Sequence, residues 1–206
     1  MTTKERIVDE ALTLFSTKGY AGTSVKNIAD AVGIKDSSLY KHFKSKKEIF
    51  NTIVREMSLR MEQMSKGIGL PDEKNVEEAA VYYGRLSMDV LLEVSRKTFL
   101  YYLKDEFAAR FRRMLVIEQY RDREIYGVYR EIFMEASIRY QTILFDEMIQ
   151  KGIFIQAAPG SMAMNFYAPM FFLLNKYDQE PEQETEAMRE LEIHVKEFSR
   201  IYLRGQ

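Results

Sequence analysis

The side chains best suited to chemistry lie in one short segment, residues 36–44, whose apolar positions Leu39 and Phe43 are four residues apart. An α-helix turns by about 100° per residue, so the residues opposite this apolar pair and on its flanks carry hydroxyl, phenol and ammonium groups. These residues are Ser37, Ser38, Tyr40, Lys41 and Lys44. Such groups donate hydrogen bonds to phosphate oxygens and base edges, so this side suits nucleic acid. The alternative is a solvated surface helix that happens to be basic.

A second short helix must precede this segment to position it. Its apolar stripe consists of Val25, Ile28, Ala29 and Val32. Ser24 stands where its hydroxyl can cap the first turn, and Gly33 permits a sharp reversal of the chain. Two short helices joined by a glycine-containing turn, the second with a polar and basic outer side, are typical of a helix-turn-helix that reads the DNA major groove.

The segment Phe15–Phe50 resembles the N-terminal domain of the tetracycline-repressor (TetR) family, without a gap, over about the first fifty residues. The agreement covers Phe15, Gly19, Tyr20, Thr23, Val25, Ile28, Ala29, Gly33, Leu39, Tyr40, His42, Phe43, Ser45 and Lys46. The chain departs from the family pattern at Lys35, where Ser or Thr is usual and could cap the helix, and the following Asp36 would be repelled by phosphate. These departures concern base preference rather than fold.

The resemblance implies a sequence-specific regulator, most often a repressor, that binds a palindromic operator in double-stranded DNA as a homodimer. The expected phosphate contacts are Thr23, Lys26, Tyr40 and Lys46, and the expected contacts to base edges are Ser37, Ser38 and Lys41. The expected DNA-binding residues also include Ser24, Lys35, His42 and Lys44.

The charge of the chain is divided unequally, although its net value is only −1. Residues 1–50 contain nine Lys or Arg and six Asp or Glu, a net charge of +3, whereas residues 51–206 contain 21 and 25, a net charge of −4. A basic N-terminal part on an acidic body indicates that a polyanion is bound by the N-terminal part alone.

No set of residues supports catalysis, a metal site or a cofactor. Cysteine is absent, and the two histidines, His42 and His194, are too few for a histidine-based metal site or a catalytic triad. The start of the chain lacks the apolar core of a signal peptide, and no apolar run is long enough to span a bilayer. We therefore expect a cytoplasmic protein that is not an enzyme and has no membrane contact.

Helical periodicity runs through the whole chain, so the predicted fold class is all-α. We expect a three-helix DNA-binding domain over residues 1–47 and a helical bundle over residues 48–206 for effector binding and dimerisation. The longer predicted helices are residues 4–18, 45–65, 76–102 (as one helix or as two joined near Ser95), 105–121, 122–151, 161–177 and 185–203.

Tyrosines in the predicted bundle point to a ligand. A buried tyrosine needs a partner for its hydroxyl, so clustered tyrosines indicate a cavity with polar groups, although ordinary core is the alternative. The TetR resemblance likewise implies an effector pocket in this domain, here for a small apolar or amphipathic molecule. The candidate lining residues are Tyr83, Tyr102, Tyr120 and Tyr129.

The last helix carries apolar residues at a spacing of 3-4-3-4, which is typical of a coiled-coil seam. With an apolar line on the helix before it, this seam predicts an isologous four-helix interface between two copies of the chain. The expected interface residues are Phe166, Met170, Leu174, Met188, Leu191, Val195, Phe198 and Tyr202.

Two other functions stay open from the sequence. One is a regulator of the same fold without a small-molecule effector, controlled by a protein partner or by its abundance. The other is a helical enzyme or lipophilic carrier with a vestigial DNA-binding domain. DNA binding by the isolated protein separates this last class from the others.

Overall fold

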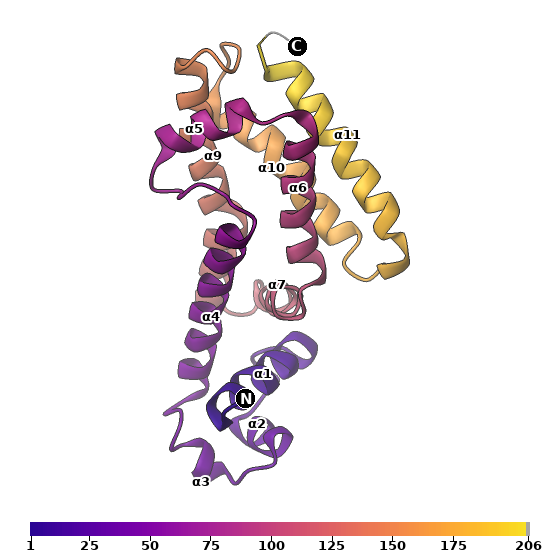
Figure 1. The fold of residues 1–206 in the computed structure, drawn as a ribbon. Helices are drawn as coiled ribbons and strands as arrows, with labels where there is room; N and C mark the ends of the chain where they lie inside the picture. Colours follow the sequence, from indigo (N-terminus) through magenta and orange to yellow (C-terminus); the bar gives the residue numbers. More distant parts are fainter. Residues whose placement is uncertain (205–206) are drawn as a thin grey trace. The chain divides into compact units, whose positions relative to one another are not determined.

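The computed structural model describes residues 1–204, which fold into the all-α structure that the sequence predicts (Figure 1). The helices are α1 (Thr3–Lys18), α2 (Val25–Val32), α3 (Asp36–Leu39), α4 (Lys46–Gly67), α5 (Val76–Arg85), α6 (Met88–Lys104), α7 (Glu106–Glu118), α8 (Arg123–Arg130), the π-helical η1 (Glu131–Glu135), α9 (Ala136–Gln150), α10 (Pro159–Lys176), the short 3-10 helix η2 (Pro181–Gln183) and α11 (Glu184–Tyr202). Within the described range the only β-type pairing is an isolated bridge between Phe154 and Leu203. None of these helices combines the length and apolar character that crossing a bilayer requires.

The chain forms two compact units. The head unit consists of Met1–Gln63 and Asp105–Arg130, and the body unit consists of Met64–Lys104 and Glu131–Gln206. The head therefore contains α1 to α3, most of α4, and also α7 and α8, which come from the middle of the sequence. The boundary expected at residue 47 does not coincide with a division between these units, because α7 packs against α1.

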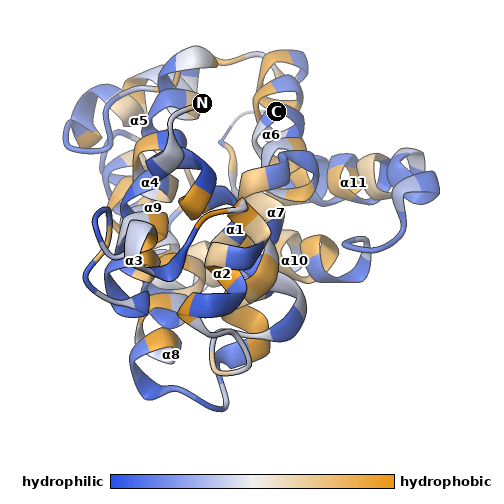
Figure 2. Ribbon diagram, turned by 90° about the horizontal axis from the view of Figure 1, so that it is seen from below, coloured by the Kyte–Doolittle hydropathy of each residue, from blue (hydrophilic) through white to orange (hydrophobic). Residues whose placement is uncertain are grey.

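The core of the head unit is built from the apolar sides of α1 to α4. The residues that are fully buried or nearly so include Ile7, Leu12, Phe15, Ile28, Leu39, Phe43, Ile49 and Ile53. Tyr20 lies between two of the rings in this core, with centroids 5.1 Å from Phe15 and 5.5 Å from Phe50, both edge-on. Figure 2 shows the resulting alternation of hydrophobic and hydrophilic segments along α1 and α2.

The core of the body unit consists of two hydrophobic clusters. In the first, Phe145 of α9 lies 5.3 Å from Phe154, 5.9 Å from Phe166 of α10 and 5.5 Å from Phe198 of α11, measured between ring centroids. The second is formed by Phe99, Leu173, Leu174, Tyr177, Ala187, Leu191 and Val195. Helix α11 is thus packed against helices of its own chain along its whole apolar side.

Two predicted helices differ from the structure in detail. Residues 76–102 do form two helices, but the join falls between Arg85 and Met88 rather than near Ser95, which is buried inside α6 and donates its hydroxyl to the Leu91 carbonyl at 2.8 Å. The long run expected over residues 122–151 is interrupted by the π-helical turn η1. Periodicity alone does not reveal a π-helical turn, because one added residue only shifts the apolar stripe.

Candidate nucleic-acid interface

The turn between α2 and α3 is fixed by local hydrogen bonds. The Ser24 hydroxyl accepts a hydrogen bond from the Asn27 amide at 3.1 Å, and the Asn27 side chain accepts one from the Ser24 amide at 2.9 Å, which caps α2 as expected. At the other end, Gly33 has a φ of 75°, and the Ile34 amide donates to the Ala29 carbonyl at 3.0 Å. These bonds set the direction in which the chain enters α3.

Helix α3 is regular over only four residues, but its hydrogen bonds extend further. The Leu39 amide donates to the Lys35 carbonyl at 3.1 Å, and the Phe43 amide donates to the Leu39 carbonyl at 3.0 Å. The helical bonding therefore covers the two turns that the sequence indicates. Leu39 and Phe43 are both buried, so this pair fixes which side of the segment faces outward.

Most of the expected DNA-binding residues are on the surface of the head unit. The exposed ones are Ser24, Lys26, Lys35, Ser37, Tyr40, Lys41, His42 and Lys44, and Ser38 is half-buried. Tyr40 is notable because 53% of it is exposed, which is unusual for a large ring on a small core. The Ser24 hydroxyl is already engaged in the cap of α2. The rest form a polar and basic surface that can donate hydrogen bonds to DNA.

Thr23 and Lys46, which we expected to contact phosphate, have partners within their own chain in this structure. Thr23 is only 1% exposed and donates its hydroxyl to the Gly19 carbonyl at 2.8 Å. The Lys46 ammonium donates to the carbonyls of Tyr20 at 2.7 Å and Thr23 at 2.8 Å, and lies 4.2 Å from the centre of the Tyr20 ring. The Thr23 hydroxyl thus ties the α1–α2 loop to the end of α1, and the Lys46 ammonium ties the same loop to the start of α4.

The Lys46 ammonium also interacts electrostatically with α7. Burial lowers the pKa of the Lys46 ammonium, and the nearby Glu118 carboxylate acts in the opposite direction. Glu118 is fully buried, and neither of its oxygens accepts a hydrogen bond. The Arg121 guanidinium lies 3.8 Å from Glu118 Oε1. The buried carboxylate of Glu118 therefore attracts the half-buried ammonium of Lys46, an interaction between the end of α7 and the start of α4 that the sequence did not indicate.

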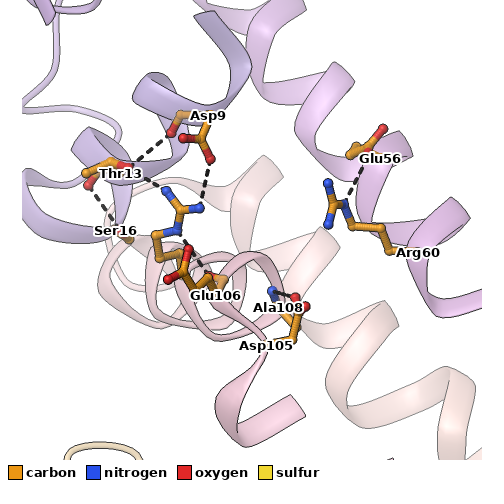
Figure 3. Close-up of polar contacts among 9 residues, drawn as sticks. Asp9, Thr13, Ser16, Glu56, Arg60, Asp105, Glu106 and Ala108 are labelled. Carbon is orange, nitrogen blue, oxygen red and sulfur yellow. Dashed lines mark hydrogen bonds and ion pairs between the residues drawn. The ribbon is translucent and has the colours of Figure 1, made fainter. Parts of the chain in front are cut away.

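Two further polar contacts attach α7 and α8 to the same helices. The Arg110 guanidinium of α7 donates to Asp9 Oδ1 at 2.8 Å and to Thr13 Oγ1 at 2.6 Å, both on α1 (Figure 3). The Lys47 ammonium donates to the Glu124 carboxylate of α8 at 2.8 Å, although this pair is exposed. The N-terminal helices are thus held by α7 and α8, which follow the body segment Met64–Lys104 in the sequence.

The four tyrosines expected to line one pocket are divided between the units. Tyr83 and Tyr102 lie in the body unit, whereas Tyr120 and Tyr129 lie in the head unit. Tyr120 is 90% exposed at the end of α7 and therefore does not line a pocket in this structure, while Tyr129 is buried in the head. Tyr83 instead packs against the same hydrophobic cluster as Tyr140 of α9, and burial is the main cause that raises the pKa of the Tyr83 phenol, with a smaller contribution from Tyr140.

The residues expected at a dimer interface face the core of their own chain. Leu191 and Val195 are buried in the second body cluster, and Phe198 in the first. The residues at the 3-4-3-4 spacing do form an apolar seam, and in the single chain this seam packs against α6, α9 and α10. The large apolar residues left exposed on α10 and α11 are Met164, Phe172, Ile193 and Ile201, with Phe172 63% exposed.

Comparisons with known proteins agree with this geometry. Residues 7–53 match the family of bacterial regulatory proteins, tetR family. Over 52 residues the chain is 54% identical to IcaR of Staphylococcus aureus, the HTH-type negative transcriptional regulator of the biofilm operon icaADBC. This match covers 25% of the chain and 28% of IcaR, so it spans less than a third of the curated relative.

The fold as a whole is that of known regulators. A regulator assigned to the TetR family in Mesorhizobium loti superposes with a TM-score of 0.68 at 20% identity, over 98% of this chain and 96% of the other. A complex of SmeT with triclosan gives a TM-score of 0.68 at 21% identity, over 99% and 93% of the chains. SmeT is the repressor of a multidrug efflux pump of Stenotrophomonas maltophilia. The relatives and neighbours that match are transcriptional regulators rather than enzymes.

Proposed function

We propose that this chain, whose residues 7–53 belong to the tetR family of bacterial regulatory proteins, is a sequence-specific transcriptional repressor that binds a palindromic operator. The observation that carries the proposal is the outer side of residues 35–44. It presents hydroxyls, a phenol and lysines, while Leu39 and Phe43 hold it on a buried core. The roles of its residues follow from their chemistry.

Base edges are proposed to be read by Ser37, Ser38 and Lys41, because short hydroxyls and a flexible ammonium reach donors and acceptors in the major groove. We propose that phosphates are held by five exposed residues near these three, Lys26, Lys35, Tyr40, His42 and Lys44. Thr23 and Lys46 support this surface from beneath. Because a bacterial operator lies on DNA in the cytoplasm, we propose that the protein acts there.

The proposed repressor acts as a homodimer. A single head reads one half-site, and a palindrome supplies two half-sites about 34–36 Å apart. The exposed apolar residues Met164 and Phe172 of α10, with Ile193 and Ile201 of α11, supply a surface that a second copy can cover. An isologous pairing of these two helices from each chain gives a four-helix interface.

Release from DNA is proposed to follow the binding of a small molecule in the body unit. The triclosan complex of SmeT, a protein of the same fold, supports a ligand-responsive body. Helix α4 runs from the head unit into the body unit, so a change of its tilt can alter the spacing of two paired heads. A coupling free energy of about 1–3 kcal/mol is typical of such effects.

Selection of sites from random double-stranded DNA tests the proposal. We expect one palindromic sequence to be enriched, and the purified protein to bind it with an affinity that falls steeply with salt. Failure to enrich any sequence, together with no binding to the bulk duplex pool, would overturn the repressor and favour the carrier or enzyme alternative.

A further inference from the structure

A lysine at the start of α4 is bonded to a carboxylate from a distant part of the sequence. Residues 41–47 contain four lysines. Within the described part of the chain, Lys47 is the one among them whose ammonium is hydrogen-bonded to a carboxylate, at 2.8 Å from Glu124 Oε2. Glu124 belongs to α8 and follows Lys47 by 77 residues. The acidic partner therefore comes from outside residues 7–53, which match the tetR family.

Glu124 is held in position by the start of α8. The Asp122 carboxylate accepts hydrogen bonds from the Glu124 amide at 2.8 Å and from the Ile125 amide at 3.1 Å. The Ile125 side chain is buried, which anchors the same turn within the head unit. Because the backbone that carries Glu124 is fixed, its carboxylate meets the Lys47 ammonium with a smaller loss of conformational freedom than a pair on mobile chain would suffer.

Lys47 stands where a bound operator is expected to bring phosphate. It is the second residue of α4, and the first turn of a helix attracts anions because its amides have no acceptors within the helix. The adjacent Lys46 is engaged by two backbone carbonyls in this structure. The Lys47 side chain is 59% exposed, so its ammonium is open to an anion from solvent. The Glu124 carboxylate and a DNA phosphate are therefore alternative partners for one ammonium.

We propose that Glu124 withholds the Lys47 ammonium from DNA phosphate and so lowers the sequence-independent part of the protein's DNA affinity. A phosphate contact strengthens binding to every duplex, because it carries no information about the bases. An internal carboxylate that occupies the ammonium removes that contribution without changing the residues proposed to read bases. The inference rests on the proposed function, since it concerns the strength with which the same head binds DNA.

Glu124→Gln tests the proposal, because it removes the charge and nearly keeps the shape of the side chain. We expect the affinity to rise about threefold, the size of an exposed ion pair, both for the selected operator and for a duplex of unrelated sequence. The slope of log affinity against log salt should become steeper by up to about 0.9, the value for one added phosphate contact. Fluorescence anisotropy titrations of the full chain at several salt concentrations measure both quantities.

A second substitution shows whether Glu124 acts through Lys47. In a chain that already carries Lys47→Gln, Glu124→Gln should leave the affinity unchanged, because no ammonium remains to be released. Glu106→Gln is the matched control for charge. Glu106 is an exposed acid of the head unit at the start of α7, so its replacement changes the net charge of that unit by the same amount. It should leave both the affinity and the salt slope unchanged.

The outcomes separate this inference from the proposed function. No gain in Glu124→Gln, or a gain that persists with Lys47→Gln or is matched by Glu106→Gln, overturns the inference while operator binding stands. A gain confined to the operator would indicate a displaced recognition segment, and would overturn it as well. Thermal unfolding checks that Glu124→Gln is folded, since loss of an exposed pair should hardly move the melting temperature. Absence of DNA binding by the parent chain overturns the proposed function, and the inference with it.

Discussion

A methyl group on Gly19 would lie 2.2 Å from Oε1 of the buried Glu118, so the loop after α1 meets the end of α7 at a position without a side chain. Gly19 also has a φ of 81° and a ψ of 156°, a conformation that is essentially restricted to glycine. Backbone and packing thus require the same residue here. Two independent constraints at one position make its substitution informative.

Gly19→Ala is expected to lower the free energy of unfolding by about 2–4 kcal/mol, because backbone strain and steric overlap with Glu118 add. Gly33→Ala is the matched control, since Gly33 has a φ of 75° but open space where a Cβ would lie. Gly33→Ala should lower the free energy of unfolding by only about 1–2 kcal/mol, from backbone strain alone. Denaturant unfolding measures both, and equal losses would contradict close packing between Gly19 and Glu118.

Lys46→Ala is expected to act mainly on stability. Removing the ammonium leaves the carbonyls of Tyr20 and Thr23 without their charged donor, which should lower the free energy of unfolding by about 1–3 kcal/mol. Lys44→Ala, two residues earlier and exposed, should change it by less than about 0.5 kcal/mol. In operator titrations at several salt concentrations, Lys44→Ala should reduce the slope of log affinity against log salt by about 0.9. The reverse pattern would restore Lys46 as the phosphate contact.

Lys41→Ala and Ser37→Ala are expected to change which bases are preferred. Both side chains lie on the outer side of the α3 segment, where loss of one base contact costs about 1–3 kcal/mol of discrimination at a single position. Site selection with each variant measures the change in base preference. Lys97→Ala, at an exposed lysine of α6, is the control. A uniform loss of affinity over all sequences would assign both residues to phosphate instead.

The dimer is expected to depend on residues that are exposed in one chain. Phe172→Glu combined with Ile193→Glu should give a monomer in sedimentation that keeps its helix content but loses tight binding to the palindrome. Leu191→Ala is the control, because Leu191 is buried within one chain. It should lower the stability by about 2–5 kcal/mol without a specific effect on association. A double variant that still sediments as a dimer would place the interface elsewhere.

The raised pKa of Tyr140 predicts a stability change at high pH. The phenol pKa is about 12 in the folded chain and about 10 when unfolded, so the folded state holds the proton to higher pH. Its contribution is fully present below pH 10 and is lost as the pH rises from about 10 to 12. Tyr140→Phe should therefore lose less stability than the parent chain between pH 9 and 11. Unfolding curves at both pH values measure the difference, and identical losses would contradict the shift.

Local signals explain why the helix-turn-helix could be predicted. The capping of α2 by Ser24, the reversal at Gly33, and the buried pair Leu39 and Phe43 are each set by residues within a few positions of one another. Such local interactions can be predicted from a short stretch of sequence. They were confirmed together with the all-α class.

The differences between expectation and structure concern groups whose partners are remote in the sequence. Lys46 is basic and lies at a helix start, but the carbonyls that hold it are more than twenty residues earlier. The seam that includes Leu191 and Val195 has the spacing of an interface, yet periodicity does not say whether the partner is the same chain or a second copy. Likewise the sequence does not distinguish Tyr120 from Tyr83, and only tertiary packing leaves Tyr120 exposed and Tyr83 half-buried.

The return of residues 105–130 to the head unit limits how this protein can be cut and recombined. The match to the family model ends at residue 53, which invites a chimera joined at that point. Such a graft would bring the recognition segment without Arg110, which bonds to α1, and without Glu118, which interacts with Lys46 of α4. During synthesis, too, the head is complete only after residue 130 has left the ribosome. A chimera that keeps the head unit intact therefore needs two segments of this chain, Met1–Gln63 and Asp105–Arg130, transferred together.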